Sequence, residues 1–467
     1  MNKNLFLLSS LIVVLLMGCS LAPKYERPAS PVPDQWPTGA AYGEMKTGAS
    51  TAAPELPWRD FITDKRLQKV IENALNNNRD LRLAALNVEK ARAYYGIQRA
   101  ELLPTVNATG IASKQLIPAD LSTTGSTTTV EQYSVSLGIT SWEIDFFGRI
   151  RNLKDNALEE YLATQEARRS ARIMLISSVT QAYLALAADK ESLKLVASTL
   201  EAQEATYNLI RKRQNAGLAS ELDIRRAQSQ VDTARGDVAR YTQITAQDEN
   251  VLNLLVGAPI PPELLPADLS SVSHPRDISP GLSSELLLRR PDVLTAEHRL
   301  KAANANIGAA RAAFFPRITL TTSIGTASAE LSGLFKDGSS TWSFLPQITL
   351  PIFDARTWSA YDVTKVEKEI SIAQYEKAIQ TAFREVADAL AVRGTVNTQI
   401  AAQQSLVEAV TETYRLSNIR YNRGIDSYLS VLDAQRSLYA AQQGLIRLYL
   451  AELVNKVTLY NVLGGGE

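Results

Sequence analysis

The feature that most constrains the fold is an internal repeat, in which one pattern of residues occurs twice. Residues 80–104 end in AYYGIQRAELLP and residues 292–316 end in ANIGAARAAFFP, so that Pro104 and Pro316 lie 212 residues apart. Further matched segments are YNLIRKRQNAG at 207–217 with YRLSNIRYNRG at 414–424, and LNLLVG at 252–257 with LYNVLG at 459–464, each 207 residues apart. A repeated unit of this length is too long for a solenoid. The repeat therefore predicts two structural halves of one molecule, 61–280 and 281–467.

Both halves carry the same order of local signals, namely a helix that ends at a proline, two strands, and two long helices. In the first half the predicted elements are a helix at 80–103, strands at 105–117 and 131–146, and long helices at 147–215 and 221–256. In the second half they are a helix at 292–315, strands at 317–328 and 341–353, and long helices at 355–423 and 428–463. Proline and glycine mark the boundaries because neither continues a helix well. The order predicts a mixed α+β fold.

The strands alternate between apolar and small polar residues, which is the signature of a sheet with two different faces. Tyr133, Val135 and Leu137 alternate with Ser134 and Ser136, a period of two. A soluble sheet with one buried face produces the same alternation. The small, uncharged polar face and the aromatic residues near the strand ends favour a membrane barrel instead. Four strands cannot close a barrel, so a membrane barrel requires several chains to share it.

The long helices exceed what a globular domain needs. Residues 147–215 and 355–423 contain no proline, and a helix of this length spans roughly 100 Å at about 1.5 Å per residue. Val363, Val366 and Ile370 recur at spacings of three and four, which indicates a heptad-like stripe. Each long helix and its partner predict a helical hairpin. A rod-like coiled coil with a purely structural role is the alternative, but it does not explain why each hairpin follows a pair of strands.

The N-terminus has the pattern of a lipoprotein signal peptide. An apolar run from Leu5 to Met17 is too short to span a bilayer as a helix, and it ends in Leu16-Met17-Gly18-Cys19. We interpret 1–18 as a signal peptide and Cys19, the only cysteine, as the acylated first residue of the mature chain. An ordinary signal peptide with an incidental cysteine is the alternative. Ser20, in place of an aspartate, favours the outer membrane.

Residues 19–60 predict an extended arm, because seven prolines interrupt any helix there. Trp36 and Trp58 favour an arm docked on the protein over a free linker, since free linkers rarely carry large aromatic side chains.

Composition argues against several function classes. Lys and Arg together number 49, as do Asp and Glu, so the basic footprint of a nucleic-acid-binding protein is absent. With two histidines and one cysteine the chain offers no metal-ligand spacing. It also lacks a nucleotide phosphate loop and a nucleophile elbow. We therefore expect no enzyme activity, no metal and no cofactor apart from the covalent lipid on Cys19, and we expect energy for any transport to come from a partner.

Four segments resemble the outer-membrane factor family, the TolC-like and OprM-like channels of tripartite pumps. They are CSLAPKYERP at 19–28, LRRPDVLTAE at 288–297, YNRGIDSYLSVLDAQRSLYAAQ at 421–442 and LYNVLGGG at 459–466. The resemblance implies a homotrimer in the Gram-negative outer membrane. In it each chain gives four strands to a twelve-stranded β-barrel, which continues into a long periplasmic α-helical barrel. It further implies a passive exit duct for small toxic compounds that works with a periplasmic adaptor protein and an inner-membrane pump of the RND class.

The resemblance also implies a gate at the periplasmic tip, at the turn between the last two long helices. The candidate gate or selectivity residues are Arg420, Tyr421, Arg423, Asp426 and Asp433. Three Asp426 carboxylates around a threefold axis would attract cations and repel anions. Alternatively, Asp426 is a helix N-cap and Asp433 a surface charge. Ser430 stands where some family members have another aspartate, which leaves a second constriction ring open.

The turns at both hairpin tips resemble the segments that meet the adaptor. The candidate contact residues are Gly217, Leu218, Ala219 and Ser220 in the first half and Gly424, Ile425 and Ser427 in the second. Glycine permits the left-handed turn, and small neighbours permit close docking.

Two other functions stay open at this stage. The same architecture serves dedicated protein export, and a periplasmic coiled-coil lipoprotein without a pore would show the same long helices.

Overall fold

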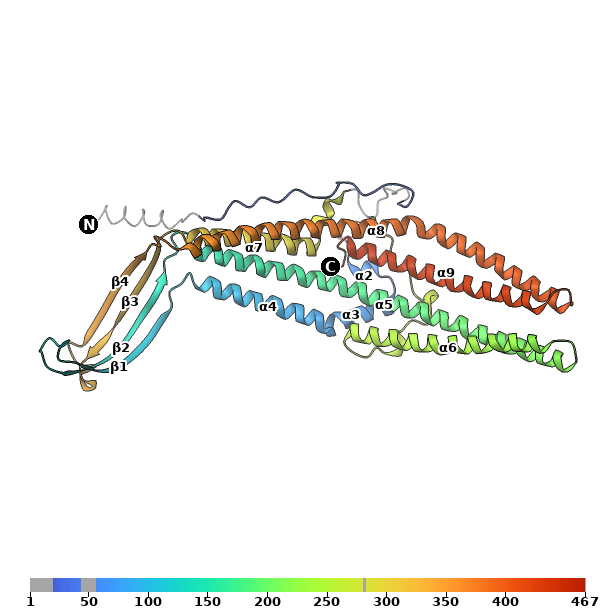
Figure 1. Cartoon of the computed structure of the whole chain (residues 1–467), viewed down its shortest axis with the longest axis horizontal. Helices are drawn as coiled ribbons and strands as arrows, with labels where there is room; N and C mark the ends of the chain where they lie inside the picture. Colours follow the sequence, from blue (N-terminus) through green and yellow to red (C-terminus); the bar gives the residue numbers. More distant parts are fainter. Residues whose placement is uncertain (1–19, 43–55, 280–282, 467) are drawn as a thin grey trace. The chain divides into compact units, whose positions relative to one another are not determined.

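A computed structural model describes residues 20–42, 56–279 and 283–466 of the chain (Figure 1). The predicted signal peptide 1–18 and the predicted lipid attachment at Cys19 lie outside these ranges.

The order of the main elements is the same in the two halves of the chain (Figure 1). The first half contains α4 (Arg79–Ala100), β1 (Val106–Ile117), β2 (Thr128–Glu143), α5 (Arg149–Asn215) and α6 (Glu221–Val256). The second half contains α7 (Pro291–Ala312), β3 (Arg317–Ser328), β4 (Ser340–Thr349), α8 (Ala355–Asn422) and α9 (Tyr428–Val462). Two helices, α2 (Trp58–Phe61) and α3 (Lys65–Asn77), precede the first set. Short 3₁₀ turns are η2 (Pro262–Leu264), η3 (Leu269–Ser271), η4 (Ser284–Arg289) and η5 (Leu331–Gly333).

Several element boundaries differ from the sequence prediction: β2 covers Thr128–Glu143 instead of 131–146, and α4 and α7 each end three residues early, at Ala100 and Ala312. Two further differences have reasons visible in the residues. β4 ends at Thr349 instead of 353, because Pro351 follows and cannot donate a ladder hydrogen bond. The predicted extended arm to residue 60 stops earlier, since α2 begins at Trp58 directly after Pro57. Proline is tolerated at a helix start, where its missing N–H has no intrahelical partner.

The compact units of the structure cut across the two sequence halves. One unit contains the described residues up to 29 together with residues 87–165 and 295–375, and so holds all four strands. The other contains the described residues from 30 to 86, from 166 to 294 and from 376 to 466, and so holds both hairpin tips. Each unit therefore draws on both repeats.

The first unit is built around a single antiparallel sheet with the strand order β1-β2-β3-β4. β1 pairs with β2 and β3 with β4 within each half, while β2 pairs with β3 across the halves. The pairing of β2 with β3 therefore joins the two repeats into one sheet. It leaves β1 and β4 as the two edges of the sheet in this chain.

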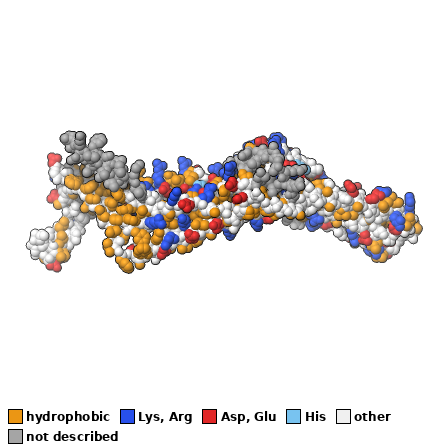
Figure 2. Space-filling view, turned by 90° about the horizontal axis from the view of Figure 1, so that it is seen from above, with side chains coloured by type: hydrophobic (Ala, Val, Ile, Leu, Met, Phe, Trp, Pro, Cys, Tyr) orange, Lys and Arg blue, Asp and Glu red, His pale blue; other side chains and the backbone are white. Residues whose placement is uncertain are grey.

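The strand register sorts the side chains into one apolar and one polar face. Leu137 of β2 stands opposite Ile324 of β3, which stands opposite Trp342 of β4. On the other face the equivalent row is Gly138, Ser323 and Ser343, and the Ser323 and Ser343 hydroxyls lie 2.7 Å apart. Trp342 is 79% exposed in the single chain, and hydrophobic side chains gather over the strands and the adjoining helix ends (Figure 2). No described residue therefore covers Trp342 on the apolar face.

A β-bulge in β2 keeps the apolar face continuous. The register shifts between Ile139 and Trp142, so that two residues of β2 oppose a single residue of β3. Ser141 takes up the irregularity with a φ of 54°, and its N–H donates to the Thr321 hydroxyl at 3.1 Å. Strict alternation would place Trp142 on the polar face. The bulge puts it opposite Leu320, on the apolar one.

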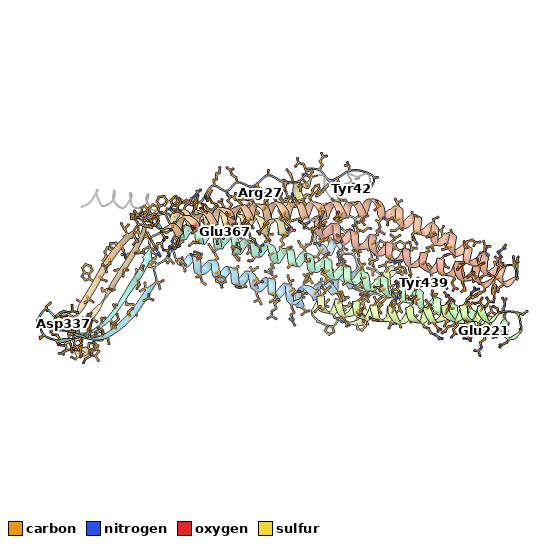
Figure 3. All side chains as sticks on the ribbon, viewed as in Figure 1. Arg27, Tyr42, Glu221, Asp337, Glu367 and Tyr439 are labelled. Carbon is orange, nitrogen blue, oxygen red and sulfur yellow. The ribbon has the colours of Figure 1, made fainter. Side chains whose placement is uncertain are left out.

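The arm packs on the protein in both of its described parts. In the first unit, Arg27 and Tyr25 both donate to the buried Glu297 carboxylate on α7, with Arg27 Nη2 at 2.8 Å from Oε2. Figure 3 marks Arg27 on this segment. In the second unit, Trp36 is buried and stacks on Phe383 with ring centroids 5.4 Å apart. Burying an aromatic side chain stabilises the folded state by about 2 kcal/mol.

Among the described residues, α5 is the one helix that length and composition would allow to cross a membrane. Its most apolar window is 61% buried within the protein. Packing of the helix against its neighbours therefore accounts for the hydrophobicity.

Two carboxyl groups face each other between α5 and α6 in the second unit. The carboxyl groups of Asp189 and Asp248 lie close enough to influence each other's protonation, because two like charges in one partly buried place are unfavourable. Burial raises the pKa of Asp189, and burial together with the Asp189 carboxyl raises the pKa of Asp248 to about 7. The adjacent Lys190 and Glu249 form an ordinary ion pair at 3.0 Å.

This pair predicts a stability that falls as pH rises. Between about pH 4 and about pH 7 the folded chain holds a proton that the unfolded chain has lost. The contribution of this pair to the free energy of unfolding is therefore complete at low pH and disappears toward pH 7. We expect Asp248→Asn, which stays neutral, to raise the melting temperature at about pH 8 and to flatten its pH dependence. Thermal unfolding of the detergent-solubilised protein measures both. Asp232→Asn, at an exposed position of α6, is the control and should leave the slope unchanged.

Candidate gate at the hairpin tips

Two turns with the same backbone form the tips of the hairpins. α5 and α6 are joined through Gly217, and α8 and α9 through Gly424, each with a φ of 74°. Leu218 N–H donates to the Arg213 carbonyl at 2.8 Å, and Ile425 N–H donates to the Arg420 carbonyl at 3.0 Å. These bonds satisfy carbonyls that the end of a helix leaves free. The left-handed φ is what requires glycine, since a Cβ at either position would meet open space.

A capping box at the first tip satisfies the backbone donors at the start of α6. The Ser220 hydroxyl accepts from Asp223 N–H at 3.1 Å, and the Asp223 carboxylate accepts from Ser220 N–H at 3.2 Å. Two donors at the start of α6 are thereby satisfied inside one turn of chain. Glu221, labelled in Figure 3, is the first residue of α6 at this tip.

The second tip uses an ion pair in place of the box. Ser427 is the N-cap of α9 but makes no side-chain cap hydrogen bond, and the position three residues later is Ser430, which is no carboxylate. Asp426 instead accepts two hydrogen bonds from Arg420, at 2.6 and 2.9 Å. The Arg420 guanidinium holds the pKa of Asp426 below its usual range. The alternative interpretation of Asp426 as an N-cap is therefore wrong.

A hydrophobic core lies beneath both tips. Its buried members are Ile210, Ile224, Ala227, Tyr428, Val431 and Leu432, and the partly buried side chains packed against them are Tyr207, Ala219, Tyr414 and Tyr421. Apart from Ala219, which lies in the first turn, the members come from α5, α6, α8 and α9. The two hairpins of one chain are thus held together by apolar contact directly behind the turns.

Arg213 adds a polar contact between the hairpins that sequence reasoning missed. Its guanidinium lies 5.0 Å from the centre of the Tyr421 ring, and Nη2 donates to Asn422 Oδ1 at 3.2 Å. The repeat contained a signal for it. Arg213 corresponds to Arg420, 207 residues later, but Ala219 stands where Asp426 would provide a local partner. Arg213 therefore contacts the other hairpin.

The structure brings only some of the predicted gate residues together. Arg420 and Asp426 form one ion pair, and Tyr421 packs in the core and under Arg213. Arg423 and Asp433 are exposed and lie outside both contacts. Of the predicted adaptor contacts, Ala219 is half-buried and the others are exposed: Gly217, Leu218, Ser220, Gly424, Ile425 and Ser427.

Within the described ranges no group of three or more His, Cys, Asp or Glu side chains is arranged to hold a metal ion. His298 pairs with Glu159, with Nδ1 2.6 Å from Oε2.

A two-faced antiparallel sheet with an uncovered apolar side, combined with long helical hairpins, defines a membrane-channel type of protein. The family model of the outer membrane efflux protein matches residues 70–258 and 282–465. The chain belongs to the outer membrane efflux protein family. It is an efflux protein of the Gram-negative outer membrane, which confirms the family and the location expected from the four sequence segments.

Relatives match the chain over nearly its whole length. A toluene efflux pump outer membrane protein of Pseudomonas putida, TtgC, is 48% identical, covering 100% of this chain and 96% of its own. The outer membrane protein OprJ of Pseudomonas aeruginosa is 44% identical, covering 100% of this chain and 97% of its own. The chain also resembles the solved open state of the MtrE outer membrane channel of Neisseria gonorrhoeae. The TM-score of that comparison is 0.85 at 39% identity, covering 96% of this chain and 98% of that one.

Loss of the Arg213 contact should loosen the tips from each other. A cation–π contact is worth about 0.5–1 kcal/mol at an exposed site, so we expect Arg213→Gln to raise hydrogen exchange at 421–427 by roughly threefold. Exchange mass spectrometry measures this. Arg225→Gln is the matched control, because Arg225 pairs with Glu221 inside α6. Equal exchange in both variants would mean that Arg213 does not restrain the second tip.

Proposed function

We propose that three copies of this chain close a shared twelve-stranded barrel in the outer membrane, and that the barrel continues into a periplasmic helical barrel. The observation that carries the proposal is the sheet itself, with one apolar face, one polar face that is almost free of charge, and two edges. Backbone groups at an open edge cannot be left unpaired in lipid. Pairing of β1 of one chain with β4 of the next would satisfy them. The number three comes from the family resemblance.

The proposed duct is passive and carries small toxic compounds. Relatives are named for toluene, solvent and antibiotic efflux, and these names support a substrate class of small, largely apolar molecules. The proposed partners are a periplasmic adaptor protein and an inner-membrane pump of the RND class. The exposed tip residues around Gly217 and Gly424 would provide the adaptor contact, because the apolar side chains of Leu218 and Ile425 are exposed at the two turns.

The gate in this proposal is the second tip. Three Asp426 side chains around a threefold axis would repel one another, and each is balanced by Arg420 of its own chain. The resting tip is therefore poised between closure and opening, since the ion pair offsets the repulsion without removing it. Arg213 and the apolar core would hold the second hairpin to the first within each chain.

Single-channel current in a planar bilayer tests the pore. We expect discrete, small, cation-selective steps from the purified oligomer. A monomeric mass without steps would favour the structural lipoprotein without a pore, and slow migration of an unheated oligomer on a gel would argue against that alternative.

Removing the acid at the tip should widen the gate and make it less attractive to cations. We expect Asp426→Ala to raise the conductance and to reduce cation preference, because it removes three negative charges and frees three Arg420 side chains. Bilayer recordings of both quantities provide the measurement. Glu221→Ala removes an exposed acid from the other tip and should change neither quantity. Unchanged conductance and selectivity in Asp426→Ala would end the gating role.

The lipid anchor on Cys19 belongs to the same proposal. Several acyl chains, at about 0.8 kcal/mol per buried methylene, would hold the N-terminus on the membrane. Mass spectrometry of the mature protein should find an acylated Cys19 as its first residue, and Cys19→Ala should lose that mass. An unmodified mature N-terminus at another residue would contradict the anchor.

A further inference from the structure

The polar face of the sheet is almost free of charge. Its residues on β1 to β4 are Ser, Thr, Asn, Gln, Gly, Ala and a few aliphatic side chains. Among the strand residues, Glu143 and Arg317 are the two charged residues on this face. The other charged strand pair, Lys114 and Glu131, follows the apolar face. The charge of the polar face is thus concentrated at the end where the strands join the helices.

Glu143 and Arg317 form one cluster with the first residue of α5. Arg317 Nε lies 2.6 Å from Glu143 Oε2, and Arg149 Nη2 lies 2.8 Å from the same oxygen. The carboxylate is enclosed, with its side chain 8% exposed, while the Arg317 side chain is 58% exposed. The charge that solvent meets is therefore the Arg317 guanidinium.

Nearby charges do not cover Arg317. Asp145 is bound by Arg151 at 3.1 Å, and Asp354 is bound by Arg356 at 2.8 Å. Glu101 acts electrostatically on Arg149, the other cation bound to the Glu143 carboxylate. A cavity of about 360 Å³ borders the cluster and is lined by Arg317, Arg149 and Phe147 among others. Solutes can therefore reach the cluster.

We propose that Arg317 is a selectivity residue of the duct, which attracts anionic solutes at the periplasmic end of the barrel lumen. The inference rests on the proposed function, because it takes the polar face to be the lumen of a shared barrel. Three such guanidinium groups form a ring with low-dielectric walls, where a charge acts more strongly than in bulk water. The duct then has two filters of opposite sign, Asp426 at the tip and Arg317 at the barrel.

The test compares two strand variants that each remove one cation paired with a carboxylate. In Arg317→Gln the Glu143 carboxylate keeps Arg149 as a partner, so the fold retains its buried pair. Lys114→Gln is the matched control, since Lys114 lies on the apolar face beside Glu131. Both proteins are first checked for an intact oligomer by gel migration. Reversal potentials are then recorded in a salt gradient, together with those of the wild type and of Arg317→Glu.

We expect Arg317→Gln to raise the cation-to-anion permeability ratio by roughly twofold, Arg317→Glu to raise it further, and Lys114→Gln to leave it unchanged. The tip is identical in all four proteins, so these differences report on the barrel. Equal ratios in conducting Arg317 variants would overturn the selectivity role while the pore stands. An equal change in Lys114→Gln would also overturn it, because the face would not matter. Intact oligomers of both the wild type and the tip variant Asp426→Ala that never conduct would overturn the pore and the filter together.

Discussion

The pairing of β2 with β3 is the contact on which the rest of the structure depends. It is the antiparallel ladder that joins the two repeats, from Tyr133 opposite Ser328 to Glu143 opposite Thr319. Because side chains alternate along a strand, this register decides which residues share a face. A slip by one residue would turn the apolar side chains of β3 toward the polar face and leave neither face uniform. The bulge at Ser141 belongs to the same constraint, since it restores the apolar face where strict alternation would break it.

The two repeats have kept one backbone and diverged in how each tip is held. Both turns have glycine at a φ of 74° and the same helix-end hydrogen bond. The first tip satisfies its donors with Ser220 and Asp223, and its arginine is free to contact the second tip. The second tip lacks the acid at Ser430 and uses Arg420 with Asp426. A locally capped turn needs nothing outside itself, whereas an exposed ion pair is weak and screened by salt. The second tip is therefore the one that a small change of environment can rearrange.

Burial separates charges that stabilise the fold from charges that a solute could meet. Glu297 and Glu143 are enclosed carboxylates, and each is held by a cation on a neighbouring segment. Removing one partner of such a pair would leave a buried charge uncompensated, which costs several kcal/mol. Arg317 shares the Glu143 carboxylate with Arg149, so its own exposed guanidinium is the less constrained of the two.

The sequence by itself determined the repeat, the order of elements, the two-faced strands and the family, because each depends on residues that are close in the chain or recur at a constant spacing. It also pointed to the second tip. It did not determine that Asp426 pairs with Arg420 rather than capping α9, that Arg213 reaches Tyr421, or that Trp142 joins the apolar face. The Asp426 pair, six residues apart, depends on the path of the turn, whereas the Arg213 contact depends on which helices pack together and the place of Trp142 on strand register. Contacts between residues some 200 positions apart are decided by the tertiary structure, since local pattern and spacing carry no information about which distant side chain completes a hydrogen bond.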